Sequence, residues 1–265
     1  STSLNLSQLS LNNWAAGGEN SLSGNVLINL NANYATEKTS WENKLVLGFG
    51  LIKQGDDPTR KSDDQINFSS KLGLKAADKW FYSALLGFNT QFAEGFDRPG
   101  DDDRTKISNF MAPGYLSLSL GMDFKPSESF SLLLSPLSGK FTFVLDDDLS
   151  AAGSFGLDPD QKTRSELGAY IKLAYVKEIL KNVSLDTRID LFSNYLENPQ
   201  HIDVNWDLLL TFKVNDYLAA SLLTQLIYDY DIKFGEDTTG DGEFDTFSEK
   251  VQFKELFGLG LTYTF

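Results

Sequence analysis

Apolar and polar side chains alternate with a period of two residues along most of this chain. The last stretch, residues 250–265, reads K-V-Q-F-K-E-L-F-G-L-G-L-T-Y-T-F, with its apolar side chains at odd positions and Leu256 as the exception. This period is typical of a β-strand with one apolar and one polar face. The stretch is about twice as long as a usual strand of roughly five or six residues. At about 3.3 Å per residue and a tilt near 45°, it can cross the hydrocarbon core of a bilayer.

Twelve segments of this kind can be marked, and the connections between them alternate between short and long. A free strand edge would leave unpaired N–H and C=O groups in lipid, so such strands must close into a barrel. Short turns after the even-numbered segments and long polar loops after the odd-numbered ones are typical of outer-membrane barrels. The segments are residues 4–11, 21–36, 41–53, 65–76, 79–92, 115–125, 130–135, 166–176, 182–195, 202–214, 218–231 and 250–265. The pattern predicts an all-β fold, a transmembrane antiparallel up-and-down β-barrel of 12 strands in one domain, residues 1–265. Both chain ends are then expected on the periplasmic side of a bacterial outer membrane.

One short apolar stretch does not fit this series. Residues 140–145, K-F-T-F-V-L, change phase after Ser138-Gly139. They fall short of the roughly nine residues that a strand needs to span a bilayer. We therefore expect an extracellular hairpin there, and two further strands, giving 14, are the alternative.

The distribution of polar and aromatic residues indicates which face meets lipid. Asparagines alternate along the second segment, and they would be costly if buried without hydrogen-bond partners, so we expect them to face a wet lumen. These are Asn25, Asn29, Asn31 and Asn33. Aromatic residues recur on the apolar face near the short turns, as in an interfacial aromatic girdle. The predicted girdle consists of Tyr34, Trp41, Trp80, Phe124, Phe130, Tyr175, Phe212, Tyr263 and Phe265. A soluble β-sandwich or lipocalin-like barrel, with its apolar face inward, is the alternative that strand length and the polar inner face disfavour.

Composition narrows the function classes. With 37 acidic and 23 basic residues the net charge is −14, which argues against nucleic acid as a partner, because phosphate binding needs a basic face. The absence of cysteine excludes disulfides and thiolate chemistry. No apolar run is long enough for a transmembrane helix. If the protein is exported, we expect Ser1 to follow a signal peptide that has been removed.

Two resemblances add to this picture. The C-terminal alternation that ends on Phe265 resembles the sorting signal that outer-membrane barrels present to the barrel-insertion machinery, which implies that machinery as a partner. The stretch N-W-A-A-G-G-E-N-S in the first loop, followed by L-x-x-G-F-G-L-x-K-Q-G-D at residues 45–56, resembles an uncharacterised outer-membrane β-barrel family of Bacteroidota. That family is known as a domain of unknown function. The resemblance extends over essentially the whole chain, implies location and fold, and brings no catalytic residues.

Charged residues of the predicted inner wall are the main functional candidates. They fall on the polar face of four adjacent segments, where side-chain charge could set ion selectivity. They are Lys172, Asp186, Arg188, Asp190, Asp203, Asp207 and Asp229. The same residues could instead form a locked salt-bridge network in a closed lumen, because twelve strands leave a narrow bore. The sequence does not choose between these alternatives.

Two loop features could bind or react. His201, the only histidine, lies near Asp203 at the predicted outer mouth and could act as a base with its orienting carboxylate, although a solvated loop histidine is the simpler interpretation. In the last loop, oxygen donors are spaced as in an EF-hand calcium loop, while a flexible acidic loop is the alternative. The predicted calcium ligands are Asp237, Thr239, Asp241 and Asp245. The clusters 101–103 and 146–148 are expected to be solvated or to bridge to lipopolysaccharide through divalent cations.

Three functions follow as hypotheses. The leading one is a narrow, porin-like pore for small solutes, in contact with outer-membrane lipid and lipopolysaccharide. The second is a non-conducting accessory or scaffold barrel in a complex with other outer-membrane subunits. The third is a hydrolase at the barrel rim, which we consider least favoured, and we do not expect an enzyme.

Overall fold

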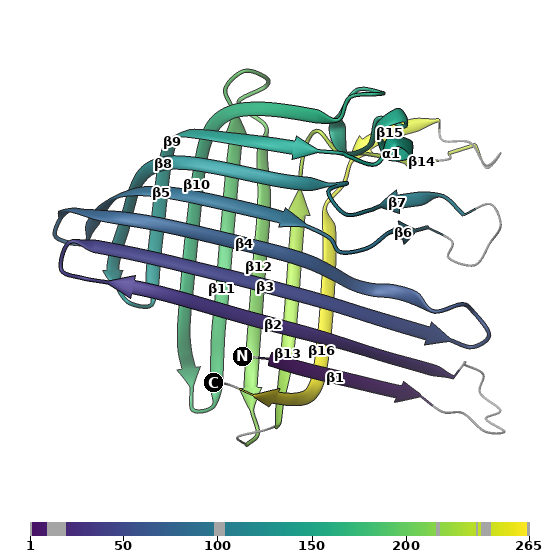
Figure 1. Ribbon diagram of the computed structural model, residues 1–265, viewed down its shortest axis with the longest axis horizontal. Coiled ribbons are helices and arrows are strands. Elements are labelled where there is room, and N and C mark those ends of the chain that lie inside the picture. The colour runs from purple at the N-terminus through teal and green to yellow at the C-terminus, as the bar shows by residue number, and fades with distance from the viewer. Residues whose placement is uncertain are drawn as a thin grey trace.

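Twelve antiparallel strands form one closed ring in the computed structural model, which describes residues 2–9, 20–97, 104–215, 218–236, 238–239 and 245–263 (Figure 1). Around the ring the order is β1-β16-β13-β12-β11-β10-β9-β8-β5-β4-β3-β2, so each strand pairs with its sequence neighbours in the ring. The strands are β1 (Thr2–Leu9), β2 (Ser21–Ala35), β3 (Thr39–Gln54), β4 (Arg60–Ala77), β5 (Trp80–Thr90), β8 (Gly114–Ser127), β9 (Phe130–Phe143), β10 (Thr163–Leu180), β11 (Val183–Asn194), β12 (Ile202–Lys213), β13 (Leu218–Tyr228) and β16 (Gln252–Tyr263). The predicted all-β, up-and-down barrel of 12 strands is confirmed.

The two ends of the barrel differ in their connections. Short turns join β2 to β3, β4 to β5, β8 to β9, β10 to β11 and β12 to β13, all at one end, which we call the turn end. The longer connections lie at the opposite, loop end. Thr2 pairs with Tyr263, so the start of β1 and the end of β16 both lie at the turn end.

The expectation of a hairpin at residues 140–145 is wrong. Residues 140–143 complete β9, which runs without a break from Phe130 to Phe143. Leu120 pairs with Leu137 while Met122 pairs with Leu134, so β9 carries one extra residue opposite β8. This β-bulge reverses the alternation beyond it and divides one long strand into two apparent short ones. No further ring strands arise, and the alternative of 14 strands is also wrong.

The loop end carries small elements of its own. They gather at one end in Figure 1. They are the hairpin of β6 (Gly95–Phe96) with β7 (Lys106–Ser108), the hairpin of β14 (Lys233–Glu236) with β15 (Thr246–Glu249), the helix α1 (Asp147–Ala151) and the 3-10 turn η1 (Ser154–Gly156). Within the part of the chain that the structure describes, no helix has the length and apolar character needed to span a bilayer.

A cluster of buried apolar side chains holds these loops together. It consists of Ala112, Val144, Leu149 and Leu157, with Phe155 packed against it. The backbone N–H of Val144 donates to the carbonyl of Lys162 at 2.8 Å, which extends the β9–β10 ladder directly into this cluster. We call residues 104–113 and 144–162 the loop cap.

Asp146 organises the polar side of the loop cap. Its carboxylate caps α1 by accepting from the backbone N–H groups of Asp148 and Leu149, as N-cap residues do. It also accepts from Lys106 Nζ at 2.8 Å and from Asn109 Nδ2 at 2.9 Å. Partial burial opposes ionisation, but the hydrogen bonds from Lys106 and Asn109 outweigh it and lower the pKa of Asp146 to about 2. The acidic cluster 146–148 therefore forms part of the polar side of the loop cap, with Asp146 as its main acceptor.

Ionised Asp146 should determine the pH at which the loop cap loses its structure. Because its folded pKa lies below the ordinary value, its contribution is present above about pH 4 and is lost as the pH falls toward 2. We expect pepsin to leave Leu149 and Phe155 uncut at pH 4 and to cut there as the pH approaches 2, which mass spectrometry of the fragments measures. Asp146→Asn should be cut already at pH 4. Equal protection of the variant and the natural protein at pH 4 would contradict this role.

Candidate functional site

An ion pair between opposite strands shows which face of the sheet is the interior. Lys44 Nζ of β3 lies 2.8 Å from Asp186 Oδ2 of β11. Five strands lie between β3 and β11 in either direction around the ring, so this contact passes through the interior. The neighbouring positions Trp41 and Leu45 have the opposite phase and therefore face outward. The apolar face is the outside of the barrel, and the polar face is its inside.

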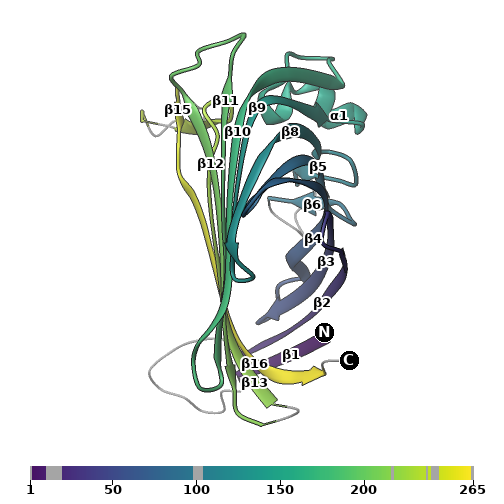
Figure 2. The same cartoon turned by 90° about the vertical axis from the view of Figure 1, so that its left-hand side faces the viewer.

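The same ion pair requires a flattened barrel. Twelve strands spaced about 4.8 Å apart and tilted near 40° would form a circular barrel about 25 Å across. A lysine and an aspartate in contact bring their Cα atoms within about 13 Å of each other. Figure 2 shows this geometry edge-on, with a nearly straight wall that contains β10 to β12 facing a curved wall that contains β2 to β9.

The interior at the turn end is crossed by a second group of charges. Asp123 of β8 is fully buried, and Lys71 Nζ of β4 lies 2.6 Å from its carboxylate. Ser131 donates to the same carboxylate at 2.7 Å. Lys125 of β8 pairs with Glu42 of β3, across the intervening β5 and β4. These contacts tie four strands together close to the short turns.

Four of the charges predicted from the sequence meet in the middle of the barrel. Lys172 of β10 lies 2.9 Å from Asp190 of the adjacent β11, and the Tyr170 hydroxyl donates to the same carboxylate. Arg188 lies 2.9 Å from Asp186, the residue that reaches Lys44 on the opposite wall.

Asp207 of β12 takes part in a separate contact. It accepts from Gln225 Nε2 of β13 at 2.9 Å. Every charge of this middle group therefore has a partner inside the barrel.

Lys140 is the centre of the group at the loop end. Its Nζ lies 2.7 Å from Asp203 of β12 and 3.0 Å from Asp229, which follows β13. Since Lys140 is on β9, these contacts also span the interior. Beside it, Arg164 lies 3.0 Å from the buried carboxylate of Glu166 on β10. All seven charges predicted for the inner wall thus lie in these last two groups.

The predicted asparagines and the described part of the predicted aromatic girdle lie on opposite faces of the sheet. Asn31 and Asn33 are exposed and pair in register with Lys44 and Glu42, so they share the interior face with those charges. Asn25 and Asn29 follow the same phase on β2. The predicted girdle contains three cross-strand pairs near the turn end, namely Tyr34 with Trp41, Trp80 with Phe124 and Phe130 with Tyr175. Phe212 faces outward near the last short turn, the side chain of Tyr263 is not described, and Phe265 lies outside the described residues.

His201 and Asp203 are not brought together as base and orienting carboxylate. The ring of His201 stacks on Tyr230 with centroids 3.6 Å apart. Asp203 instead pairs with Lys140. The hydrolase hypothesis therefore lacks the contact on which it depends.

The structure describes only part of the loop that was predicted to bind calcium. Both carboxylate oxygens of Asp245 accept hydrogen bonds from Thr238, and the N–H of Thr239 donates to one of them at 3.0 Å. Asp237 and Asp241 lie outside the described residues, as do residues 10–19 of the first loop and 101–103. Calcium binding stays a prediction.

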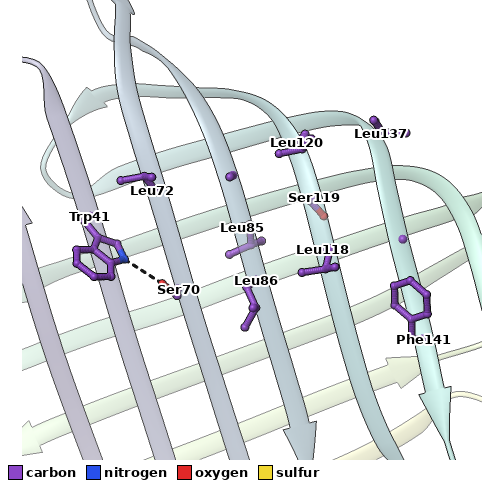
Figure 3. A pocket seen from close by; sticks show the side chains of 12 residues that line it. Trp41, Ser70, Leu72, Leu85, Leu86, Leu118, Ser119, Leu120, Leu137 and Phe141 are labelled. Atoms are coloured by element: carbon purple, nitrogen blue, oxygen red, sulfur yellow. Dashed lines mark hydrogen bonds between the residues drawn. The ribbon is translucent and has the colours of Figure 1, made fainter.

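An apolar hollow marks the outside of the curved wall (Figure 3). It has a volume of about 630 Å³ and is formed where small residues such as Ala84 and Gly139 lie among outward leucines, including Leu118 and Leu120. Its polar atoms are used internally, since Trp41 Nε1 donates to Ser70 Oγ at 3.0 Å and Ser70 donates to Asn43. The surface around the hollow thus offers apolar contacts. The hydrogen-bonding groups of Trp41 and Ser70 are already paired with other side chains.

Sequence reasoning missed half of the interior network. The missing partners include Lys44, Lys71, Lys125, Lys140, Arg164, Glu42, Asp123 and Glu166. Each of them lies on the polar phase of its strand, which is the signal that could have identified it. Lys140 was hidden by the bulge, because it was assigned to a loop.

Comparisons with known proteins give a family match over part of the chain and a distant structural similarity. A family model described as a protein of unknown function (DUF3078) matches residues 6–96, about a third of the chain, including both stretches that carry the family resemblance. No curated protein matches the sequence. Among solved structures, the outer membrane phospholipase A from Escherichia coli is similar at 12% identity and a TM-score of 0.35, over 100% of this chain and 97% of that one.

The Lys71–Asp123 pair provides a test of the interior network. Lys71→Met leaves a fully buried carboxylate with less compensation and should lower the free energy of unfolding by about 3 kcal/mol. Urea titration of the protein in lipid vesicles measures this. Lys71→Met/Asp123→Leu should recover at least half of the loss, and exposed Lys75→Met should be neutral. A neutral Lys71→Met would contradict a stabilising role for this pair.

Proposed function

We propose that this protein is an outer-membrane β-barrel whose lumen is closed, and that it acts as a non-conducting accessory barrel. Membrane embedding is supported by the outward face. Leu118, Leu120 and Leu259 expose 43%, 55% and 55% of their surface on that face. A water-soluble protein rarely leaves so large a continuous apolar surface exposed. The aromatic pairs near the turn end fit the interfacial position of such residues in membrane barrels.

The observation that carries the closed lumen is the ion pair between Lys44 and Asp186. It joins opposite walls, so solute would have to pass beside a contact that already spans the short dimension of the barrel. Two further groups, around Asp123 at the turn end and around Lys140 at the loop end, lie in series with it. Solute crossing the barrel would have to break paired charges at three successive levels.

The paired charges inside the barrel also disfavour a pore. Charged rings in selective channels act on passing ions because their charges remain available to those ions. Here Asp186, Asp190 and Asp203 are each engaged by a cation of the barrel itself. An accessory role also suits the loop cap, which presents a folded surface with its own apolar cluster above the membrane.

Embedding in lipid can be tested with one outward residue. Leu118→Arg should destabilise the barrel in lipid vesicles by about 2–4 kcal/mol, the cost of a basic residue near the middle of the hydrocarbon. Leu196→Arg, in a loop where Leu196 is 73% exposed, is the matched control and should be neutral. If the outward face met water instead, Leu118→Arg would be neutral as well.

Closure of the lumen can be tested by conductance. The purified protein should show no channel openings in planar bilayers. Lys44→Ala alone should remain silent, because the other two levels are intact, whereas a variant with Lys44, Lys71, Lys125 and Lys140 all replaced by alanine should conduct. Steady openings from the unmodified protein would overturn the closed lumen and return the pore hypothesis to first place.

A further inference from the structure

The apolar hollow on the outside of the barrel crosses five neighbouring strands of the curved wall. Figure 3 shows the residues that line it, which extend from Trp41 of β3 to Phe141 of β9. The strands β3, β4, β5, β8 and β9 pair with one another in this order, and all lining residues in Figure 3 belong to the described part of the chain. With strands about 4.8 Å apart, the four spacings make the hollow about 19 Å long.

The hollow runs obliquely from the turn end of the barrel toward the loop end. Trp41 lies two residues after Thr39, where β3 begins at the turn end. Phe141 lies two residues before Phe143, where β9 ends at the loop end. The hollow therefore extends along the depth of the barrel as well as around its wall.

Small residues form the floor of the hollow, and exposed leucines form its sides. Ala84 lies among the exposed side chains of Leu86 and Leu120. Gly139 contributes no side chain, and a Cβ there would lie 3.1 Å from the ring of Phe141. The wall of a neighbouring barrel would rest on the leucines and leave the floor without contacts, whereas a single hydrocarbon chain can enter between them.

The polar side chains beside the hollow are paired within the barrel wall. Ser70 accepts from Trp41 Nε1 and donates to Asn43 Oδ1. The amide of Asn43 donates in turn to the carbonyl of Ala32 at 3.0 Å. Polar groups that face hydrocarbon need partners of this kind inside the protein. Because these side chains bind one another, the hollow offers a ligand apolar contacts, and it can recognise a hydrocarbon chain but not a headgroup.

Packing decides which hydrocarbon chain fills the hollow. No hydrophobic effect drives association inside a bilayer, so differences in van der Waals contact decide instead. Each such contact is weak, but the contacts add up along a chain that follows the lining over its whole length. A straight saturated chain can do this, whereas a cis double bond bends the chain away from the floor. The hollow therefore favours saturated chains.

We propose that the hollow binds one saturated acyl chain of a phospholipid from the membrane leaflet at the turn end. The chain enters beside Trp41, lies over Ala84 and points toward Gly139, while the headgroup stays at the membrane surface. One leaflet provides about 15 Å of chain, half of a hydrocarbon core of about 30 Å, and the hollow is long enough to hold it. This rests on the proposed embedding in the membrane and is independent of the closed lumen.

Native mass spectrometry of the protein released from lipid nanodiscs measures which lipid stays bound. The nanodiscs contain equal amounts of phosphatidylcholine with two saturated palmitoyl chains and phosphatidylcholine with two oleoyl chains, each of which has a cis double bond. The unmodified protein should retain one lipid, and should prefer the palmitoyl form by at least about threefold. Phosphatidylglycerol with the same two pairs of chains should give the same preference, because the hollow does not contact the headgroup.

Two variants with matched controls test the hollow itself. Ala84→Leu fills the floor and should remove the preference for palmitoyl chains, whereas Ala220→Leu should keep it. Ala220 pairs with outward Phe212 and Leu259, and its strand β13 lies opposite β5 in the ring. Leu137→Ala removes part of the side of the hollow and should weaken the preference. Leu134→Ala, at an exposed leucine of the same strand that does not line the hollow, should leave it unchanged. Urea titration checks that each variant is folded.

Three outcomes would overturn the proposal. These are equal retention of both lipids by the unmodified protein, a preference that survives Ala84→Leu, and retention that follows the headgroup and not the chain. Failure of the protein to insert into the nanodiscs would instead contradict the embedding in the membrane. Channel openings from a protein that prefers the palmitoyl lipid would contradict the closed lumen alone.

Discussion

Backbone hydrogen bonding around a ring of strands is the constraint on which this structure depends. In hydrocarbon, an N–H or C=O group has no partner except another backbone or side-chain group of the protein. Long strands with an apolar outward face satisfy this condition by pairing with both neighbours. The alternation that places leucines outside then necessarily places asparagine, aspartate and lysine inside. The polar interior is thus a consequence of the ring, before any function is considered.

The interior charges determine the shape of the ring more than its stability. A buried ion pair often gains little over an apolar contact of the same size, because both charges must be desolvated. The Lys44–Asp186 pair nevertheless fixes how close the two walls lie, since its length sets their separation. The groups around Asp123 and Lys140 fix the cross-section nearer the two ends. The narrow lumen follows from this bracing between walls.

The sequence predicts the strands well because a period of two is a local property. It fails at the bulge in β9, where one extra residue reverses the phase and conceals Lys140. Contacts such as Lys44 with Asp186 could not be predicted, because they depend on the flattening of the ring, which is not encoded locally. The same holds for the pairing of β1 with β16, because the sequence does not indicate how many residues of these two strands pair.

The loop cap is built on the barrel without an intervening flexible joint. Val144 follows β9 directly, and its hydrogen bond to Lys162 continues the ladder of β9 with β10. Leu145 in turn donates to the carbonyl of Met111, which lies just before β8. A change in the spacing of these three strands at the loop end would therefore reposition the cap. A surface epitope on α1 would then report on the width of the barrel below it.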